Sequence, residues 1–235
     1  MFYIIFVCIK LNIMIMSRLQ VTDDGSHTLS SDKVDENYHS LYGAIQESEH
    51  IFIDAGLAAV TDKNYKQINV LEVGTGTGLN ILLTYLWSVK YNLSIEYHGY
   101  EPYPISKEDV ILLNYPEQLG VDEKLFFHIH DKIGTPVNLS DKFSLLINKA
   151  IIQNSKLKPG YYDVIYFDAF SPDSQPEMWT TEVFGKIYDS LKSGGVLTTY
   201  SCKGNVKRSL KEAGFKIEKL PGPPGKREFL RAYKK

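Results

Sequence analysis

The chain has 235 residues, of which 43% are hydrophobic and 23% charged, and its formal net charge is −2. The length and composition are typical of one globular domain with a sizeable core, and the net charge argues against a protein that coats nucleic acid generally. The two cysteines, Cys8 and Cys202, offer neither a disulfide framework nor zinc-ligand spacing, so we expect a reducing, cytoplasmic setting.

The first sixteen residues are almost wholly apolar and are interrupted only by Lys10 and Asn12. This segment is short for a membrane span, and it lacks the cationic start and the small-residue cleavage site of a signal peptide. Because Met14 and Met16 are both possible initiators, we expect the apolar extension to be a mis-assigned start and residues 17–235 to form a single domain.

After a polar stretch over residues 21–35, helical and extended patterns alternate along the chain. This alternation predicts an α/β fold of the Rossmann-like kind, with a mostly parallel central sheet and helices on both faces. Residues 134–136 (Gly-Thr-Pro) are expected to join two strands as a hairpin or an extended loop. The expected helices lie within 38–59, 79–90, 106–113, 178–191 and 206–213. The expected strands are 69–73, 93–100, 125–129, 142–148, 161–167, 196–200, 215–219 and 227–233.

A glycine-rich turn follows the first strongly buried strand. Its glycines stand at the first, third and fifth positions of the turn. A dinucleotide fingerprint requires glycines at the first, third and sixth positions, and the sixth position here is Leu79. Glu72 stands just inside the turn, and a carboxylate there suits the cationic amino acid group of S-adenosylmethionine better than the pyrophosphate of NAD. The alternative is an ordinary turn without a ligand. The expected cofactor-binding residues here are Glu72, Gly74, Thr75, Gly76, Thr77, Gly78 and Asn80.

A second acidic residue, Glu101, stands at the carboxyl end of the strand expected over 93–100. Ligands of open α/β sheets bind outside the carboxyl ends of the strands. A carboxylate about 20 residues past the glycine turn is placed to accept hydrogen bonds from both ribose hydroxyls. Glu101 is therefore a candidate cofactor ligand, and the alternative is a capping or surface acid ahead of Pro102.

The central strand expected over 161–167 is followed by Asp168, with Phe170 two residues later. A carboxylate that leaves the sheet beside the glycine turn can accept N–H bonds from an amine, orient its lone pair toward a methyl group and collect its proton. Phe170 would supply an apolar wall. The alternative is that Asp168 only caps its loop.

Positive charge is concentrated in the last part of the chain. Residues 203–235 carry eight Lys and three Arg against three Glu, a balance of +8, so the remainder of the chain carries −10. A basic region on an acidic body indicates either a local site for a polyanion or an ordinary solvated face.

Several blocks of residues are specific in combination: GAIQESEHIF (43–52), GTGTGLN (74–80), DAFSP (168–172), QPEMW (175–179), GG (194–195) and GKRE (225–228). With them the chain resembles, from about residue 37 to residue 235, the methyltransferase domain of the MnmC type, also found as a stand-alone protein called MnmD. This family is tRNA (5-methylaminomethyl-2-thiouridine)-methyltransferase. The resemblance implies a class I S-adenosylmethionine-dependent methyltransferase fold.

The resemblance also implies a substrate, the wobble uridine of certain tRNAs, whose 5-aminomethyl nitrogen receives the methyl group to give 5-methylaminomethyl-(2-thio)uridine. Asp168 would then hold the amine as the catalytic residue. The two-domain members carry an FAD-dependent oxidase that this sequence lacks, so other enzymes are expected to make the aminomethyl intermediate. The family's acidic residue near the adenine has no counterpart at residues 148–151, which leaves that contact unassigned.

Further residues are carried over as candidates. Glu47 would close over the cofactor, or is a helix-surface glutamate. Phe170 and Trp179 are possible stacking faces for a splayed base, or core residues. The other substrate-binding candidates are Ser171 and Pro172 beside the amine, and Lys203, Lys207, Arg208, Lys226 and Arg227 for phosphates.

Three competing functions remain. An aminopropyltransferase of the spermidine synthase kind shares the expected fold and uses a decarboxylated cofactor, against which Glu72 argues mildly. A non-catalytic RNA-binding module would keep the fold without the chemistry. A dehydrogenase is disfavoured by Leu79, which replaces the third glycine of the dinucleotide fingerprint.

Overall fold

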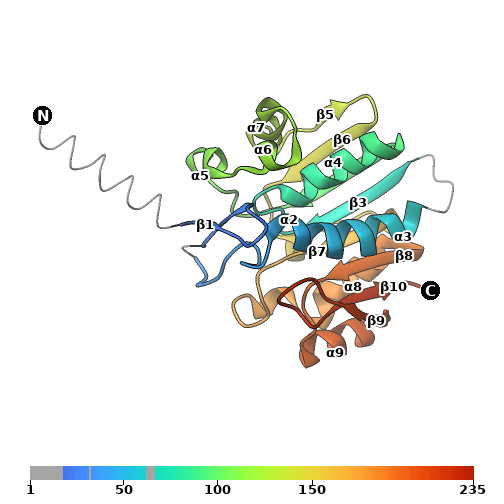
Figure 1. Ribbon diagram of the computed structural model, residues 1–235. Helices are drawn as coiled ribbons and strands as arrows, with labels where there is room; N and C mark the ends of the chain where they lie inside the picture. Colours follow the sequence, from blue (N-terminus) through green and yellow to red (C-terminus); the bar gives the residue numbers. More distant parts are fainter. Residues whose placement is uncertain (1–17, 32, 62–66) are drawn as a thin grey trace, which may run out of the picture.

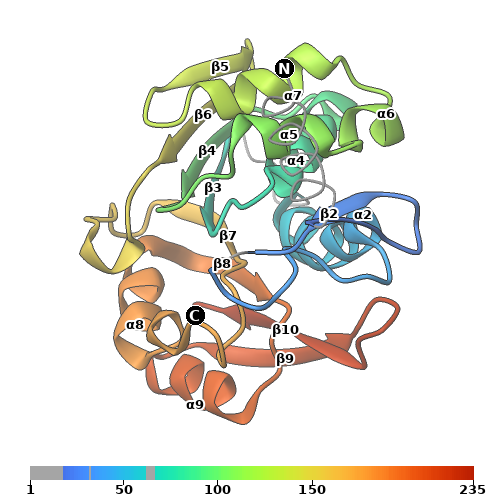
Figure 2. The ribbon, with the colours of Figure 1, turned by 90° about the vertical axis from the view of Figure 1, so that its left-hand side faces the viewer.

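A computed structural model describes residues 18–31, 33–61 and 67–235, so the expected mis-assigned start over residues 1–16 lies outside the described residues. The main sheet has eight strands in the order β5-β6-β4-β3-β7-β8-β10-β9 (Figures 1 and 2). Its strands are β3 (Ile68–Val73), β4 (Ile95–Tyr100), β5 (Val137–Ser140), β6 (Phe143–Asn148), β7 (Tyr162–Phe167), β8 (Leu191–Thr199), β9 (Lys216–Pro221) and β10 (Glu228–Tyr233).

The centre of this sheet is parallel and its margins are antiparallel. Strands β6, β4, β3, β7 and β8 pair in parallel, whereas β5 pairs antiparallel with β6, and β10 pairs antiparallel with both β8 and β9. Every residue of β3 and β7 is buried, which is typical of parallel strands that are covered on both faces. The predicted mostly parallel sheet is confirmed.

Helices cover both faces, as predicted (Figure 2). On one face Val70 of β3 and Val164 of β7 pack with α4 and the η1 helix, whereas on the other Leu71 and Ile165 pack with α8 and α9. The helices are α2 (Ala44–Ser48), η1 (Glu49–Leu57, a π-helix), α3 (Ala58–Thr61), α4 (Leu79–Tyr91), α5 (Lys107–Leu112), α6 (Tyr115–Leu119), α7 (Glu123–Asp131), η2 (Ile152–Asn154), η3 (Pro176–Met178), α8 (Thr181–Ser190) and α9 (Gly204–Glu212).

The strand expected over residues 125–129 is wrong, because these residues lie within helix α7. The side chain of Asp122 accepts a hydrogen bond from the Lys124 amide (2.9 Å) and caps the helix. Phe126 and Ile129, three residues apart, are its buried positions, so the apolar run follows a helical spacing. The loop at residues 134–136 therefore joins this helix to β5.

Other boundaries differ from the expectation by a few residues. A small antiparallel sheet pairs β1 (Leu19–Val21) with β2 (His27–Leu29), and β2 lies within residues 21–35, for which no strand was expected. The expected helix over 178–191 begins three residues later and ends at Ser190, and residues 193–195 belong to β8. Within the described ranges, none of the helices has the length and apolar character that crossing a membrane requires.

The register of the central strands brings three chain segments to one edge. Val73, the last residue of β3, is paired with Tyr100 of β4 on one side and with Phe167 of β7 on the other. The residues that directly follow these strands, among them Glu101 and Asp168, therefore lie side by side at the carboxyl edge of the sheet.

Candidate active site

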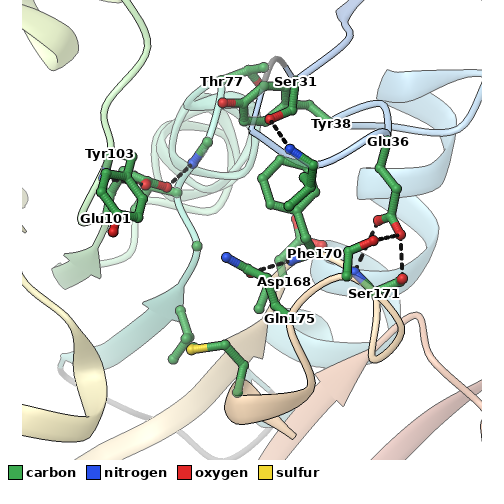
Figure 3. Close-up of a pocket in the computed structure, with 18 of the residues that line it drawn as sticks. Ser31, Glu36, Tyr38, Thr77, Glu101, Tyr103, Asp168, Phe170, Ser171 and Gln175 are labelled. Atoms are coloured by element: carbon green, nitrogen blue, oxygen red, sulfur yellow. Dashed lines mark hydrogen bonds between the residues drawn. The ribbon is translucent and has the colours of Figure 1, made fainter.

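A cavity of about 580 Å³ lies at this carboxyl edge (Figure 3). Its wall includes residues of the glycine-rich turn 74–80, of segment 100–103 after β4, and of loop 168–178 after β7, which we call the acceptor loop. A further wall comes from residues 33–41, which precede the main sheet in the chain and which we call the cover segment.

The glycine turn approaches the acceptor loop so closely that a side chain does not fit between them. Gly74, Gly76 and Gly78 have φ angles of +86°, +46° and +77°, which only glycine adopts readily. A Cβ atom on Gly74 would lie 2.5 Å from the backbone oxygen of Asp168. Gly78 is the N-cap of α4, so the turn leads directly into the first crossover helix.

Glu101 is held against the glycine turn by backbone hydrogen bonds (Figure 3). Its two carboxylate oxygens accept one bond each, from the Gly76 amide (3.0 Å) and from the Tyr103 amide (2.9 Å). Burial raises the pKa of this carboxyl, and the two amide bonds oppose that shift. Glu101 therefore faces the cavity in a fixed orientation, with lone pairs left for a ligand.

Glu72 lies behind the cavity wall instead of in it. Its side chain is fully buried, and its oxygens accept hydrogen bonds from Asn80 Nδ2 (2.8 Å) and from the Tyr97 hydroxyl (2.7 Å). Burial raises the pKa of Glu72 to about 8. Asn80, in contrast, lines the cavity, and its Oδ1 atom has no hydrogen-bond partner among the described residues. Glu72 is thus absent from the cavity wall, and the Asn80 side chain that it accepts from lines the cavity.

Asp168 also lines the cavity, and it is the second carboxyl group that is hydrogen-bonded to Asn80. Its Oδ2 atom accepts the second hydrogen of the Asn80 amide (3.0 Å). Burial raises the pKa of Asp168 well above its ordinary value, and the charges of Glu72 and Glu47 add to this effect, whereas Lys226 opposes it. A raised pKa makes the Asp168 carboxylate a stronger proton acceptor than an ordinary aspartate.

The core anchors the backbone of the acceptor loop at two points. The Trp179 indole N–H donates to the Phe170 carbonyl (2.9 Å), and the Tyr200 hydroxyl donates to the Ala169 carbonyl (2.9 Å). Trp179 is itself buried against Phe167, so it offers no face to the cavity. Phe170 does line the cavity, together with Ser171, whereas the buried Pro172 lies outside the wall.

The cover segment, whose role was not predicted from the sequence, contacts both the acceptor loop and the glycine turn. Glu36 accepts hydrogen bonds from the Ser171 amide (3.0 Å) and from the hydroxyls of Ser171 and Ser174 (Figure 3). The Tyr38 ring packs on Phe170, with 5.1 Å between the ring centroids. His39 Nε2 is hydrogen-bonded to Thr77 Oγ1 of the glycine turn (2.7 Å).

The basic candidates do not gather at one place. Lys226 lines the cavity and pairs with Glu47 (2.9 Å). Lys203 pairs with Asp173 of the acceptor loop. The remaining candidates lie outside the cavity wall: Lys207 and Arg208 line a shallow groove beside α9 and β9, and Arg227 is exposed.

Comparison with known proteins agrees with this geometry. The family model described as S-adenosyl-L-methionine-dependent methyltransferase matches residues 135–235. The tRNA 5-methylaminomethyl-2-thiouridine biosynthesis bifunctional protein MnmC of Aromatoleum aromaticum is 30% identical over 230 residues, which are 92% of this chain and 35% of the relative. The protein of the same name from Leptospira borgpetersenii is 30% identical over 85% of this chain and 32% of its own.

Among solved structures, MNMC2 from Aquifex aeolicus matches with a TM-score of 0.77 and 27% identity, covering 93% of this chain and 70% of that one. The chain spans about a third of the length of the curated relatives it matches. Together these comparisons confirm the family predicted from the sequence motifs, the MnmC-type S-adenosyl-L-methionine-dependent methyltransferase domains.

Proposed function

We propose that this chain transfers the methyl group of S-adenosylmethionine to the nitrogen of a 5-aminomethyl group on the wobble uridine of tRNA. One observation carries the proposal: Asp168, a carboxylate suited to holding an amine, shares one cavity with the glycine turn and with Glu101. The MnmC relatives are named for biosynthesis of the corresponding nucleoside. We expect the enzyme to act in the cytoplasm, where its tRNA substrate is modified.

The residues that line the cavity suit the chemical groups of S-adenosylmethionine. Gly74 and Gly76 line the cavity and carry no side chains, so a ligand can come close to the backbone of the turn. Glu101 is placed to accept hydrogen bonds from the ribose hydroxyls, and the unpartnered Asn80 Oδ1 is an acceptor for the amino acid's ammonium group. Ile151 and Ile152 give the wall an apolar part for the adenine. When bound, the cofactor supplies a methyl group on a positively charged sulfur.

The chain's own contribution is to place the amine and to remove its proton. The Asp168 carboxylate accepts an N–H bond from the amine, which points the nitrogen lone pair away from the carboxylate. When the nitrogen gains a methyl group it must lose a proton, and Asp168 receives that proton directly or through a water. Phe170 forms an apolar wall that excludes water from the nucleophile.

A tRNA assay tests the proposed function. Methyl groups labelled with a radioisotope on S-adenosylmethionine should be transferred to tRNA that lacks the final wobble methylation, and nuclease digestion should place the label on the wobble nucleoside. Transfer to putrescine from the decarboxylated cofactor would instead support an aminopropyltransferase. Cofactor binding without transfer to any tRNA would support an RNA-binding module.

Salt dependence tests the basic candidates on α9. Replacing both Lys207 and Arg208 by glutamine should reduce the slope of log Kd against log salt for tRNA by about two, because each phosphate contact contributes about one. The matched control is Lys124→Gln, an exposed lysine on α7, at the other end of the sheet (Figure 1). Equal slopes in the double variant and the wild type would remove α9 from the tRNA-binding surface.

A further inference from the structure

Two carboxyl groups, those of the fully buried Glu72 and the partly exposed Asp168, are joined by a single amide. Asn80 Nδ2 lies 2.8 Å from Glu72 Oε1 and 3.0 Å from Asp168 Oδ2, so one NH₂ group donates to both. The NH₂ group of Asn80, and not its carbonyl oxygen, faces the two carboxylates, because carboxylate oxygens accept hydrogen bonds and only the NH₂ group can donate them. Glu72 lies in β3, Asn80 in the first turn of α4, and Asp168 directly after the end of β7.

The two ends of this chain of hydrogen bonds face different surroundings. Glu72 is fully buried and its other oxygen accepts from Tyr97, whereas Asp168 is partly exposed to the cavity. No salt bridge reaches either carboxyl among the described residues, although the charge of Lys226 acts on Asp168. Two ionised carboxylates in one buried network repel each other, so ionisation of one disfavours ionisation of the other.

We propose that Glu72 is a positioning residue which, through the Asn80 side chain, holds the Asp168 carboxyl in the orientation and charge state that the substrate amine requires. The inference rests on the proposed function, because it takes Asp168 as the amine holder. It assigns to Glu72 an effect on Asp168, the residue that holds the substrate amine, in addition to any effect on the cofactor. The buried position of Glu72 behind Asn80 allows no direct contact with either ligand.

The groups around both carboxyls fix the sign of the expected effect. Tyr97 and Asn80 donate to Glu72, and Glu101 adds a like charge. The charged groups that act on Asp168 are Glu72 and Glu47, which raise its pKa, and Lys226, which lowers it; the Tyr200 hydroxyl faces the same loop. Because ionisation of either carboxyl disfavours ionisation of the other, a residue at position 72 that cannot ionise lowers the pKa of Asp168.

The test is Glu72→Gln, which keeps an oxygen to accept from Asn80 and removes the charge. The side-chain carboxyl carbon of Asp168, observed by NMR in ¹³C-labelled protein, should titrate at a pH lower by about one unit or more. The acid limb of the pH profile of kcat should move in the same direction. Glu101→Gln is the comparison variant, which also removes a charge from the cavity; its effect on Asp168 should be smaller, because Glu101 is bonded to backbone amides and not to Asn80.

An Asp168 midpoint in Glu72→Gln that equals the wild-type midpoint would overturn the inference, as would an equal shift in Glu101→Gln. A thermal unfolding curve of each variant shows whether the fold is kept. Because the NMR titration needs no methyl transfer, it decides the link between the two carboxyls even if the wild type methylates no tRNA. Failure of the proposed function is thereby distinguished from failure of this inference.

Discussion

Replacement of Asp168 by alanine should lower the rate of methyl transfer by at least about 100-fold, the range expected when a positioned acid–base group is lost. The amine would lose its hydrogen-bond acceptor and its proton acceptor together. Affinity for S-adenosylmethionine should change only several-fold, because the glycine turn and Glu101 are held by backbone bonds that do not involve the Asp168 side chain. Single-turnover rates and calorimetric binding of the cofactor measure the two effects separately.

The matched control for this substitution is Asp189→Asn, which removes an exposed carboxylate on α8 outside the cavity wall. Its rate should stay within about two-fold of wild type, as is usual for exposed positions. A second variant, Asp168→Asn, keeps the size of the side chain and should still be slow, since an amide does not take up a proton at neutral pH. Full activity in either Asp168 variant would remove this residue from the catalytic role.

Replacement of Gly74 by alanine should abolish binding of S-adenosylmethionine. The new Cβ would meet the backbone oxygen of Asp168 at 2.5 Å, and neither the turn nor the strand end can move without disturbing the cavity. The φ angle of +86° adds strain of about 1–2 kcal/mol for any residue with a Cβ. Equilibrium dialysis with labelled cofactor measures the loss.

Gly134→Ala is the control that distinguishes the steric clash at Gly74 from the strain of a positive φ angle. Gly134 has a φ angle of +84°, almost that of Gly74, but a Cβ atom there would have no neighbour within 4 Å. This variant should be slightly less stable than the wild type and should bind the cofactor normally. If both alanine variants bound the cofactor equally well, the glycine turn would not be its binding site.

The central strands and the order of the site residues could be predicted from the sequence, because they depend on local patterns. Apolar runs mark β3 and β7, and a parallel sheet brings the residues after its strands to one edge, so Glu101 and Asp168 were expected near the glycine turn. The strand expected over 125–129 failed because a short apolar run suits both a strand and one face of a helix.

Other features depend on contacts between distant residues and leave no local signal. Nothing in the sequence pairs Glu36 with Ser171, which is 135 residues away. The position of Glu72 behind Asn80 depends on how β3 and β4 pack, since Tyr97 of β4 holds its second oxygen. An acidic residue inside a glycine turn therefore predicts a carboxylate near the cofactor, but not whether it touches the cofactor.

The bonds of the cover segment also bear on how the protein folds. The contact between Glu36 and the acceptor loop cannot form until β7 has joined the sheet, and contacts of such large sequence separation form slowly because their loop-closure entropy comes first. We therefore expect the cavity to be completed late in folding. During refolding, the spectroscopic signal of the sheet should return before the ability to bind the cofactor does.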